Sequence, residues 1–435
     1  MFEETVPGLY YWNIIGQAFM ISIFIHLIII FILAFWWFTR YPENGKLVYW
    51  LSLVFKLGAG LVLGYVYSIY YIDSDTFNFF QDSLRLAEIA KANWREYVTY
   101  LWFEKEPAFS GENRTLFFVK LVSAFTLLTQ GNYWVASLYF SLFSFAASWW
   151  LVSLICRYYP KAKFAAILAF LLFPSSVFWS SGIIKESAAM TMLYVLLGIF
   201  IIVWQQKKFI WIQSAALLMA TWILWSLKYY YAAVFFPVAL SALLTRWFVQ
   251  VRMRPSAVSA YREFVLLIVL LMVFVFIVTF VHPNFYPQRI LEVVVENYEA
   301  FRDKSDPEKM VHFYELKPTV GSFLLNAPWA LVSGLFRPFV WEASNIFSLL
   351  VAVGNLILLA LTVYSFRYFR ALTTSPDRLL LFALIVYCIS LCIFLTLSAP
   401  NFGTYVRYRV GFFPLFIFLI AMGLPLEKWI KKITG

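Results

Sequence analysis

The stretch from residue 13 to residue 37, NIIGQAFMISIFIHLIIIFILAFWW, decides the fold class. It contains no Lys, Arg, Asp or Glu, and it is as long as the roughly 20 residues that an α-helix needs to cross the hydrocarbon layer of a membrane. It ends on Trp36 and Trp37, and tryptophans are enriched where a span meets water. The stretch therefore predicts a membrane-spanning helix.

Similar stretches recur outward from this one along the whole chain. Hydrophobic residues make up 63% of the 435 residues and charged residues 13%, and the mean hydropathy is +0.77. Because lipid offers the backbone no hydrogen-bond partners, spans of this kind are helices. We expect an all-α polytopic membrane protein with about eleven transmembrane helices, within a range of ten to thirteen. The predicted spans are approximately 13–37, 48–70, 134–155, 164–181, 187–204, 209–226, 229–245, 263–281, 344–366, 379–398 and 407–424.

The basic residues of the short loops predict how the chain is oriented. Most of them fall on one side of the predicted membrane, which by the positive-inside rule is the cytoplasmic side. They are Arg40, Lys46, Arg157, Lys161, Lys163, Lys207, Lys208, Arg246, Arg252, Arg254, Arg262, Arg367, Arg370, Arg378, Lys428, Lys431 and Lys432. The net charge of +11 is explained by this distribution, so a nucleic-acid partner is not expected. We expect a bacterial inner-membrane protein with an external N-terminus and a cytoplasmic C-terminus.

Two long external segments, 71–133 and 282–343, belong to what we predict to be a single membrane domain over 1–435. Residues 83–100, 115–128 and 290–301 have the periodicity of helices that lie along the membrane surface. The apolar piece 323–335 is interrupted by Pro328 and is either a re-entrant segment or a further pair of spans.

Two carboxylates, Asp73 and Asp75, directly follow the second predicted span. Such a pair can supply a general base, can hold a divalent cation, or can mark the solvated end of a helix. These readings remain open, and no other cofactor is expected.

Three charged residues lie in short external turns. Lys185 and Glu186 begin the fifth predicted span, where the acid suits the positive end of the helix dipole and the lysine opposes it. Either an anion bound at that helix start or extension of Lys185 into water explains the lysine. Lys228 precedes three tyrosines, a combination that can bind phosphate or sugar but also fits an interfacial aromatic belt.

Further charges precede the last spans from the external side. Arg337 and Glu342 lie in the segment FRPFVWE, where an ion pair that anchors the loop is the simplest interpretation. Arg407 and Arg409 enter the final span from outside, and two such arginines need water, lipid headgroups or an anionic ligand. Guanidinium groups suit phosphate especially well.

These residues together predict one external site that combines carboxylates with cations. Its members are Asp73, Asp75, Lys185, Glu186, Lys228, Arg337, Glu342, Arg407 and Arg409. A carboxylate can deprotonate an acceptor while the cations stabilise a departing phosphate or diphosphate.

The acidic pair in the first large external loop, followed by surface helices and a span, resembles the GT-C membrane glycosyltransferases of the dolichyl-phosphate-mannose and aminoarabinose transferase type. The segment PSSVFWSSGIIKE, residues 174–186, and the pair Arg407 and Arg409 with Pro414 are also similar to that family. The resemblance is best over roughly residues 60–205. It implies that Asp73 or Asp75 is the catalytic base or metal-contacting carboxylate, and that Lys185, Arg407 and Arg409 contact the phosphate of a lipid-linked sugar donor.

Two features depart from the GT-C pattern: the acidic pair follows the second span rather than the first, and no large soluble C-terminal domain is present. Bacterial polysaccharide polymerases and O-antigen ligases resemble the arginine-rich external ends equally well. A third reading is a transporter or flippase for a lipid-linked glycan, or a scaffold of an export machine. Transport would require charges deep in the spans, and the candidates are Lys56, which can extend to water, and His26, which is more often a hydrogen-bonded core residue. The expected partners are a lipid-linked donor, a glycan, lipid or protein acceptor, and membrane lipids.

Overall fold

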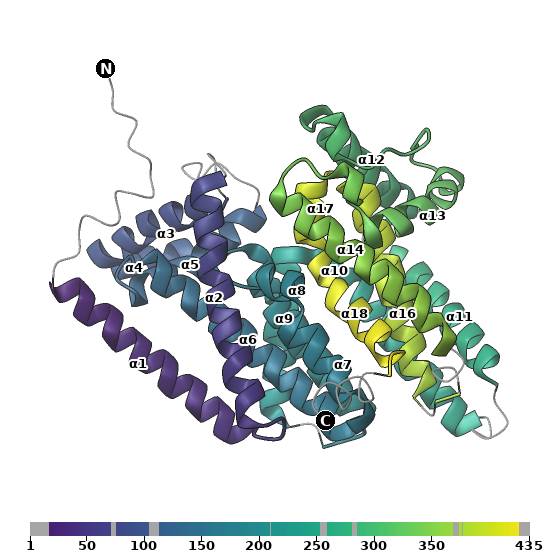
Figure 1. The fold of residues 1–435 in the computed structure, drawn as a ribbon, viewed down its shortest axis with the longest axis horizontal. Helices are drawn as coiled ribbons and strands as arrows, with labels where there is room; N and C mark the ends of the chain where they lie inside the picture. Colours follow the sequence, from purple (N-terminus) through teal and green to yellow (C-terminus); the bar gives the residue numbers. More distant parts are fainter. Residues whose placement is uncertain are drawn as a thin grey trace. The chain divides into compact units, whose positions relative to one another are not determined.

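The computed structural model describes residues 17–70, 75–103, 113–208, 210–252, 259–280, 285–368, 374–375 and 377–425, and these residues are predominantly helical (Figure 1). The main helices are α1 (Gln17–Arg40), α2 (Lys46–Tyr70), α3 (Asp75–Ala92), α4 (Trp94–Phe103), α5 (Asn113–Leu128), α6 (Tyr133–Tyr158), α7 (Lys163–Ile167), α8 (Pro174–Phe178), α9 (Lys185–Trp204), α10 (Trp211–Arg252), α11 (Ala260–Thr279), α12 (Pro287–Lys304), α13 (Val320–Phe336), α14 (Ile346–Ser365), α16 (Arg378–Ser398), α17 (Phe402–Tyr408) and α18 (Phe413–Met422).

The chain is an all-α, multi-pass membrane protein. Within its described residues, eight helices are long and apolar enough to cross a membrane, and a ninth span results if the bent pair of α17 and α18 is counted as one. The eight are α1, α2, α6, α9, α10, α11, α14 and α16. In α6 and α9 78% of the apolar window is buried, against 17% in α11 and α14. Helices α6 and α9 therefore lie in the interior, whereas α11 and α14 present apolar side chains to lipid.

The structure has eight to nine candidate spans among its described residues against the predicted eleven, because one predicted span is not a continuous helix and two others lie in α10, which is kinked between them. Residues 164–181 do not form a continuous span but comprise α7, a π-helical turn (Leu168–Leu172) and the short α8. Phe173 leaves the helical conformation with ψ 117, since the residue before a proline is disfavoured in the α region. The predicted spans 209–226 and 229–245 are the two parts of α10, which has one non-helical residue, Lys228.

The last predicted span, 407–424, is a broken one. Its two parts, Phe402–Gly411 and Phe413–Met422, are bent by 65°. Pro414 lies in the first turn of α18, where a proline is tolerated because it lacks only an N–H that has no helical partner there. The sequence predicted an apolar segment here correctly, but it did not predict the bend.

The predicted loop helices are present. The first long external segment contains α3, α4 and α5, and the second contains α12 and α13. Pro328 lies inside α13 without ending it, so the residues around 323–335 form one helix of 17 residues rather than a pair of spans.

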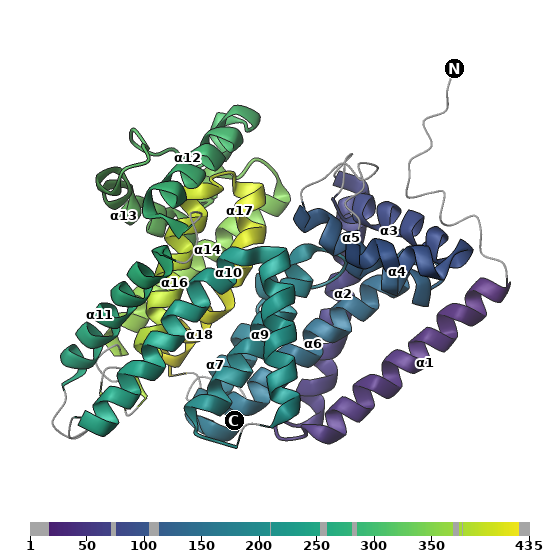
Figure 2. The ribbon, with the colours of Figure 1, turned by 180° about the vertical axis from the view of Figure 1, so that it is seen from behind.

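Contacts divide the chain into two compact units, and the single membrane domain stays a prediction. Unit 1 comprises Met1–Pro160, Ser176–Val203 and Lys208–Tyr229. Within it, α2 and α6 lie side by side, and α3, α4 and α5 gather at one end of them (Figures 1 and 2). Unit 2 comprises Lys161–Ser175, Trp204–Lys207 and Tyr230–Gly435. Within it, α12 and α13 lie at one end of α16 (Figure 2).

Hydrogen bonds within each unit join loops that were predicted to lie on the same side of the membrane. In unit 1, Thr76 of the first external segment donates to the carbonyl of Ile183 in the turn before α9 (2.7 Å). In unit 2, Asn401 before α17 donates to Ser305 of the second external segment (2.9 Å). Arg246 donates to the carbonyl of Trp204, which joins two predicted cytoplasmic ends.

Candidate functional site

The start of α3 lies against the start of α9 in unit 1. The Thr76 hydroxyl bridges them, since it donates to the Ile183 carbonyl and lies 2.8 Å from the Tyr133 hydroxyl. Gly182 makes the approach possible with a φ of +69°, a conformation that favours glycine, and its N–H donates to Ser141 (3.0 Å). Asp75, the first residue of α3 and the neighbour of Thr76, is therefore held near the turn that leads into α9.

Lys185, the first residue of α9, turns toward the first external segment. Its Nζ donates to the Thr115 hydroxyl of α5 (2.7 Å) and lies 4.8 Å from the centre of the Phe79 ring of α3. Residues 70 positions apart in the sequence thus meet at one helix start. A cation held here adds to the positive potential of the free N–H groups at the start of α9, which favours an anionic ligand.

Glu186 and Lys228 form a buried ion pair beside this helix start. Lys228 Nζ lies 2.7 Å from Glu186 Oε1, and the two side chains are 5% and 2% exposed. Lys228 has φ −144° and ψ 66°, so the non-helical residue of α10 is the one that carries the charge.

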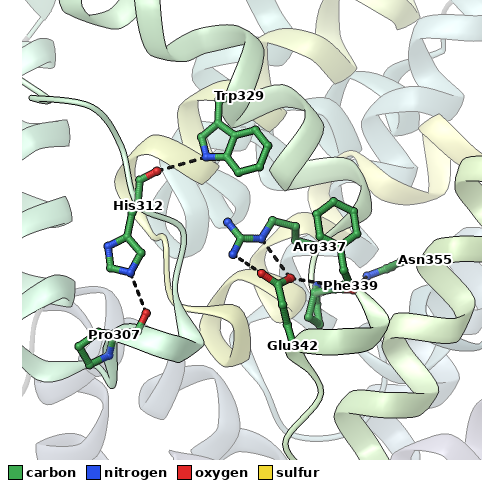
Figure 3. Close-up of polar contacts among 8 residues, drawn as sticks. Pro307, His312, Trp329, Arg337, Phe339, Glu342 and Asn355 are labelled. Atoms are coloured by element: carbon green, nitrogen blue, oxygen red, sulfur yellow. Dashed lines mark hydrogen bonds and ion pairs between the residues drawn. The ribbon is translucent and has the colours of Figure 1, made fainter.

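Arg337 and Glu342 form the ion pair that the sequence suggested, in unit 2 (Figure 3). Arg337 Nε donates to Glu342 Oε2 (3.1 Å), and its Nη2 donates to Oε1. The Phe339 N–H also donates to Glu342 (2.7 Å), and the guanidinium lies over the rings of Trp329 and Phe402. Both charges are thus engaged within the loop, which supports an anchoring role and leaves little of the guanidinium for a ligand.

The two arginines of the last membrane segment differ from one another. Arg407 is partly exposed and lies 5.5 Å from the ring of Tyr408. Arg409 is 1% exposed, donates through Nη2 to Asn355 Oδ1 (3.1 Å), and lies 4.0 Å from the centre of the Phe413 ring.

The predicted site residues fall into two groups. Unit 1 brings Asp75, Lys185, Glu186 and Lys228 to the region where α3 and α9 begin, and unit 2 contains Arg337, Glu342, Arg407 and Arg409. Asp73 lies outside the described residues. One site that contains all of these residues stays a prediction.

A metal site is also left as a prediction. Among the described residues, no three His, Cys, Asp or Glu side chains are close enough to hold a metal ion together. The acidic pair of the sequence includes Asp73, which the structure does not describe, so a divalent cation at Asp73 and Asp75 is not tested.

Sequence reasoning missed the residues that hold the site together. Thr76, Thr115 and Tyr133 of unit 1 and Asn355 of unit 2 are uncharged and lie far along the chain from their partners. Their only local signal is a polar residue within an apolar or helical stretch, and such residues are common in membrane helices.

The two charges expected inside spans have different surroundings. Lys56 does not extend to water as the sequence suggested: it is 3% exposed, and its Nζ donates to the Ser180 hydroxyl (2.5 Å). His26 is hydrogen-bonded within the core, as predicted, with Nδ1 2.9 Å from the Tyr139 hydroxyl.

In comparisons with known proteins, no family model, no curated protein and no solved structure matches the chain.

Proposed function

We propose that the protein is a membrane glycosyltransferase of the GT-C type, which transfers a sugar or glycan from a polyprenyl-phosphate or polyprenyl-diphosphate donor to an acceptor on the external face of the membrane. The observation that carries this proposal is the meeting of α3 and α9 in unit 1. It holds Thr76, the neighbour of Asp75, against Ile183 in the turn that precedes Lys185 and Glu186.

Glycosyl transfer from such a donor requires one group that accepts a proton and another that stabilises the departing phosphate. The Asp75 carboxylate accepts the proton of the acceptor hydroxyl, whose oxygen forms a bond to the anomeric carbon of the donor sugar. The bond between that carbon and the phosphate oxygen breaks, and the electron pair leaves with the phosphate. Lys185, together with the free N–H groups at the start of α9, stabilises the negative charge that develops there.

The buried pair of Glu186 and Lys228 supports Lys185 indirectly. Because Lys228 neutralises Glu186 at 2.7 Å, the acid does not cancel the positive potential around Lys185. Arg407, which is partly exposed in unit 2, remains a proposed contact of the donor phosphate. The membrane spans give a lipid-linked donor its route to the protein.

A polysaccharide polymerase or ligase would use the same donor chemistry with a glycan as acceptor. The residues of unit 1 favour none of these acceptors over another, and we retain polymerisation and ligation as variants of the proposed transfer.

Transport of a lipid-linked glycan is a second candidate, and two observations favour it. Lys56 is a buried lysine within a membrane span, and the last apolar segment is bent by 65° between α17 and α18. Charged residues inside spans and discontinuous helices are typical of transporters.

The test is whether the purified protein, in detergent or lipid nanodiscs, releases polyprenyl phosphate or diphosphate from lipid-linked sugars. We expect turnover that falls in Asp73→Asn, Asp75→Asn, Lys185→Met and Arg407→Ala. Asp82→Asn is the matched control, because Asp82 lies on α3 like Asp75 but pairs with the exposed Arg85 (3.2 Å).

Turnover that survives the substitution of both Asp73 and Asp75 would contradict the assigned base. If no donor is consumed but the same lipid crosses the bilayer of proteoliposomes containing the protein, the transport reading replaces the transferase.

A further inference from the structure

Arg409 lies at the break in the last membrane segment. It is the first residue of the turn Arg409–Gly411, which joins α17 to α18, and the two parts of the segment are bent by 65° at this point. Its side chain is 1% exposed and is among the largest that are fully buried in the described part of the chain. Irregular backbone at membrane depth is tolerated where it is buried in protein or lines a cavity.

The guanidinium of Arg409 has few partners for its size. Nη2 donates to Asn355 Oδ1 (3.1 Å), whereas Nε and Nη1, which carry most of its N–H donors, have no hydrogen-bond partner. Within the described residues, no carboxylate pairs with it. Two other arginines of unit 2 differ: Arg337 is bidentate to Glu342, and Arg378 is bidentate to Glu263 (2.8 Å for both contacts).

An arginine in this state lacks a counter-charge. The guanidinium stays protonated in proteins, so burial does not relieve its charge as it does for a lysine. Leaving its N–H donors unpaired and removed from water is unfavourable. A bound anion with two or more oxygen atoms would satisfy the free donors and the charge together.

The surroundings of Arg409 orient it for such an anion. The Asn355 amide is fixed on both sides, because Oδ1 accepts from Arg409 while Nδ2 donates to the Pro338 carbonyl (3.2 Å), next to the loop of Figure 3. The Phe413 ring covers one face of the guanidinium at 4.0 Å, which leaves its edges for hydrogen bonds. Phe413 is also the first residue of α18, so the ring that covers the guanidinium belongs to the start of that helix, where Pro414 contributes no N–H.

We propose that Arg409, Asn355 and the start of α18 form a binding site for a phosphate group in unit 2. Phosphate has tetrahedral oxygens that match both the guanidinium edge and a helix start. The assignment of this phosphate to a lipid carrier rests on the proposed function, whereas the presence of a phosphate site does not. Since Arg409 is 1% exposed, the ligand must displace neighbouring side chains, and we expect slow binding.

The first experiment measures thermal unfolding of the purified full-length protein in detergent. Inorganic phosphate is titrated against chloride at equal ionic strength, and farnesyl phosphate is titrated against farnesol. We expect phosphate to raise the unfolding temperature, and Arg409→Met to weaken this binding at least about tenfold. Arg289→Met is the control, because Arg289 is exposed on α12 of the same unit.

The absence of phosphate gives a second readout from the same variants. If Arg409 awaits an anion, Arg409→Met removes an uncompensated charge and unfolds at the same or a higher temperature than the wild type. If the arginine is only a structural residue, the variant unfolds at a lower temperature, with and without phosphate, and the proposal is overturned.

Asn355→Asp keeps the experiment decisive should Arg409→Met fail to fold. The new carboxylate lies where Asn355 Oδ1 now accepts from Arg409 and supplies the missing counter-charge, at the cost of the bond to Pro338. We expect it to raise the unfolding temperature without phosphate and to abolish the phosphate response. An undiminished response in this variant contradicts the proposal.

The two ligands distinguish the source of the phosphate. A stronger response to farnesyl phosphate than to inorganic phosphate indicates a lipid headgroup, and the reverse indicates free phosphate. A response to neither overturns the site. Because binding is measured without turnover, an inactive transferase that still binds phosphate through Arg409 separates failure of the proposed function from failure of this inference.

Discussion

The buried pair of Glu186 and Lys228 makes unit 1 sensitive to single charge changes. The two atoms are 2.7 Å apart, and both side chains are nearly inaccessible to water. Removal of one partner leaves the other as a buried, uncompensated charge, which typically costs about 3–5 kcal/mol. The loss of stability on removal of one partner is therefore larger than the net stabilisation that the ion pair contributes.

We predict that Lys228→Met lowers the thermal stability of the protein strongly, and that Lys228→Met combined with Glu186→Gln restores most of the loss. The double variant replaces two charges by neutral groups of similar size. The matched control is the exposed pair of Asp82 and Arg85, where Arg85→Met should cost less than about 1 kcal/mol. A double variant as unstable as Lys228→Met alone would contradict the pairing.

Asp82 gives a prediction about pH. Burial raises the pKa of its carboxyl, and the neighbouring Arg85 partly offsets the rise. The folded protein therefore binds this proton more tightly than the unfolded chain, so ionisation of Asp82 lowers the free energy of unfolding. This loss is complete above the raised pKa and disappears as the pH falls through that pKa toward the ordinary value of about 3.9.

Asp82→Asn should accordingly raise the unfolding temperature slightly at neutral pH, by less than about 1 kcal/mol in free energy, because the side chain is partly exposed. The advantage over the wild type should vanish below about pH 4. Unfolding curves across this pH range test it, and an advantage that grows in acid would contradict the sign.

The sequence predicted the charged residues of the candidate site better than their contacts. Lys185 and Arg409 were noted in the sequence because each is a cation at the external start of a predicted membrane span. That Lys185 meets Thr115 across 70 residues, and that Arg409 meets Asn355 across 54, depends on how distant helices pack. Local hydropathy carries no information about such contacts.

At the scale of the helix, the path of α2 depends on the absence of a side chain at Gly60. A Cβ there would overlap the Ser141 hydroxyl of α6 and lie 3.2 Å from the N atom of Gly182. Ser137 of α6 also donates to the Gly60 carbonyl (3.2 Å). The glycine thus lets α2 approach both α6 and the turn that leads to α9.

We predict that Gly60→Ala destabilises the protein by about 1–3 kcal/mol, since the added methyl group forces α2 and α6 apart. Gly58→Ala is the control on the same helix, because nothing lies within 4 Å of its added Cβ. It should be neutral or stabilising by up to about 1 kcal/mol. Equal effects in unfolding experiments would contradict the packing of α2.

Hydropathy was sufficient to predict the long helices, but it did not predict where helices are interrupted. The runs that became α1, α2, α6, α9, α11, α14 and α16 are predominantly apolar over the length that a span needs, and this predicts a span. Residues 164–181 are equally apolar, but Pro174 and the π-helical turn before it interrupt the helix. At Lys228, where the sequence predicted a short turn between two spans, the backbone is non-helical and α10 is kinked.

At the scale of the whole molecule, the orientation in the membrane is a prediction from the basic loops. We expect a cysteine introduced at Lys208 to react with a membrane-impermeant maleimide only after cells are opened, and one at Glu308 to react in intact cells. Both side chains are exposed; the native Cys388 and Cys392 are buried, and the partly exposed Cys156 is replaced by serine in both variants. The opposite pattern of labelling would invert the topology and move the candidate site to the cytoplasmic face.

The most direct test of the proposed function is the rate at which the purified protein releases the carrier lipid from a polyprenyl-linked sugar, compared between Asp75→Asn and Asp82→Asn. Both substitutions neutralise a carboxylate of α3, but only Asp75 lies at the meeting of α3 and α9. We predict a rate at least about 100-fold lower in Asp75→Asn, as expected for loss of a general base, and an unchanged rate in Asp82→Asn. Equal rates in the wild type and Asp75→Asn would contradict the account.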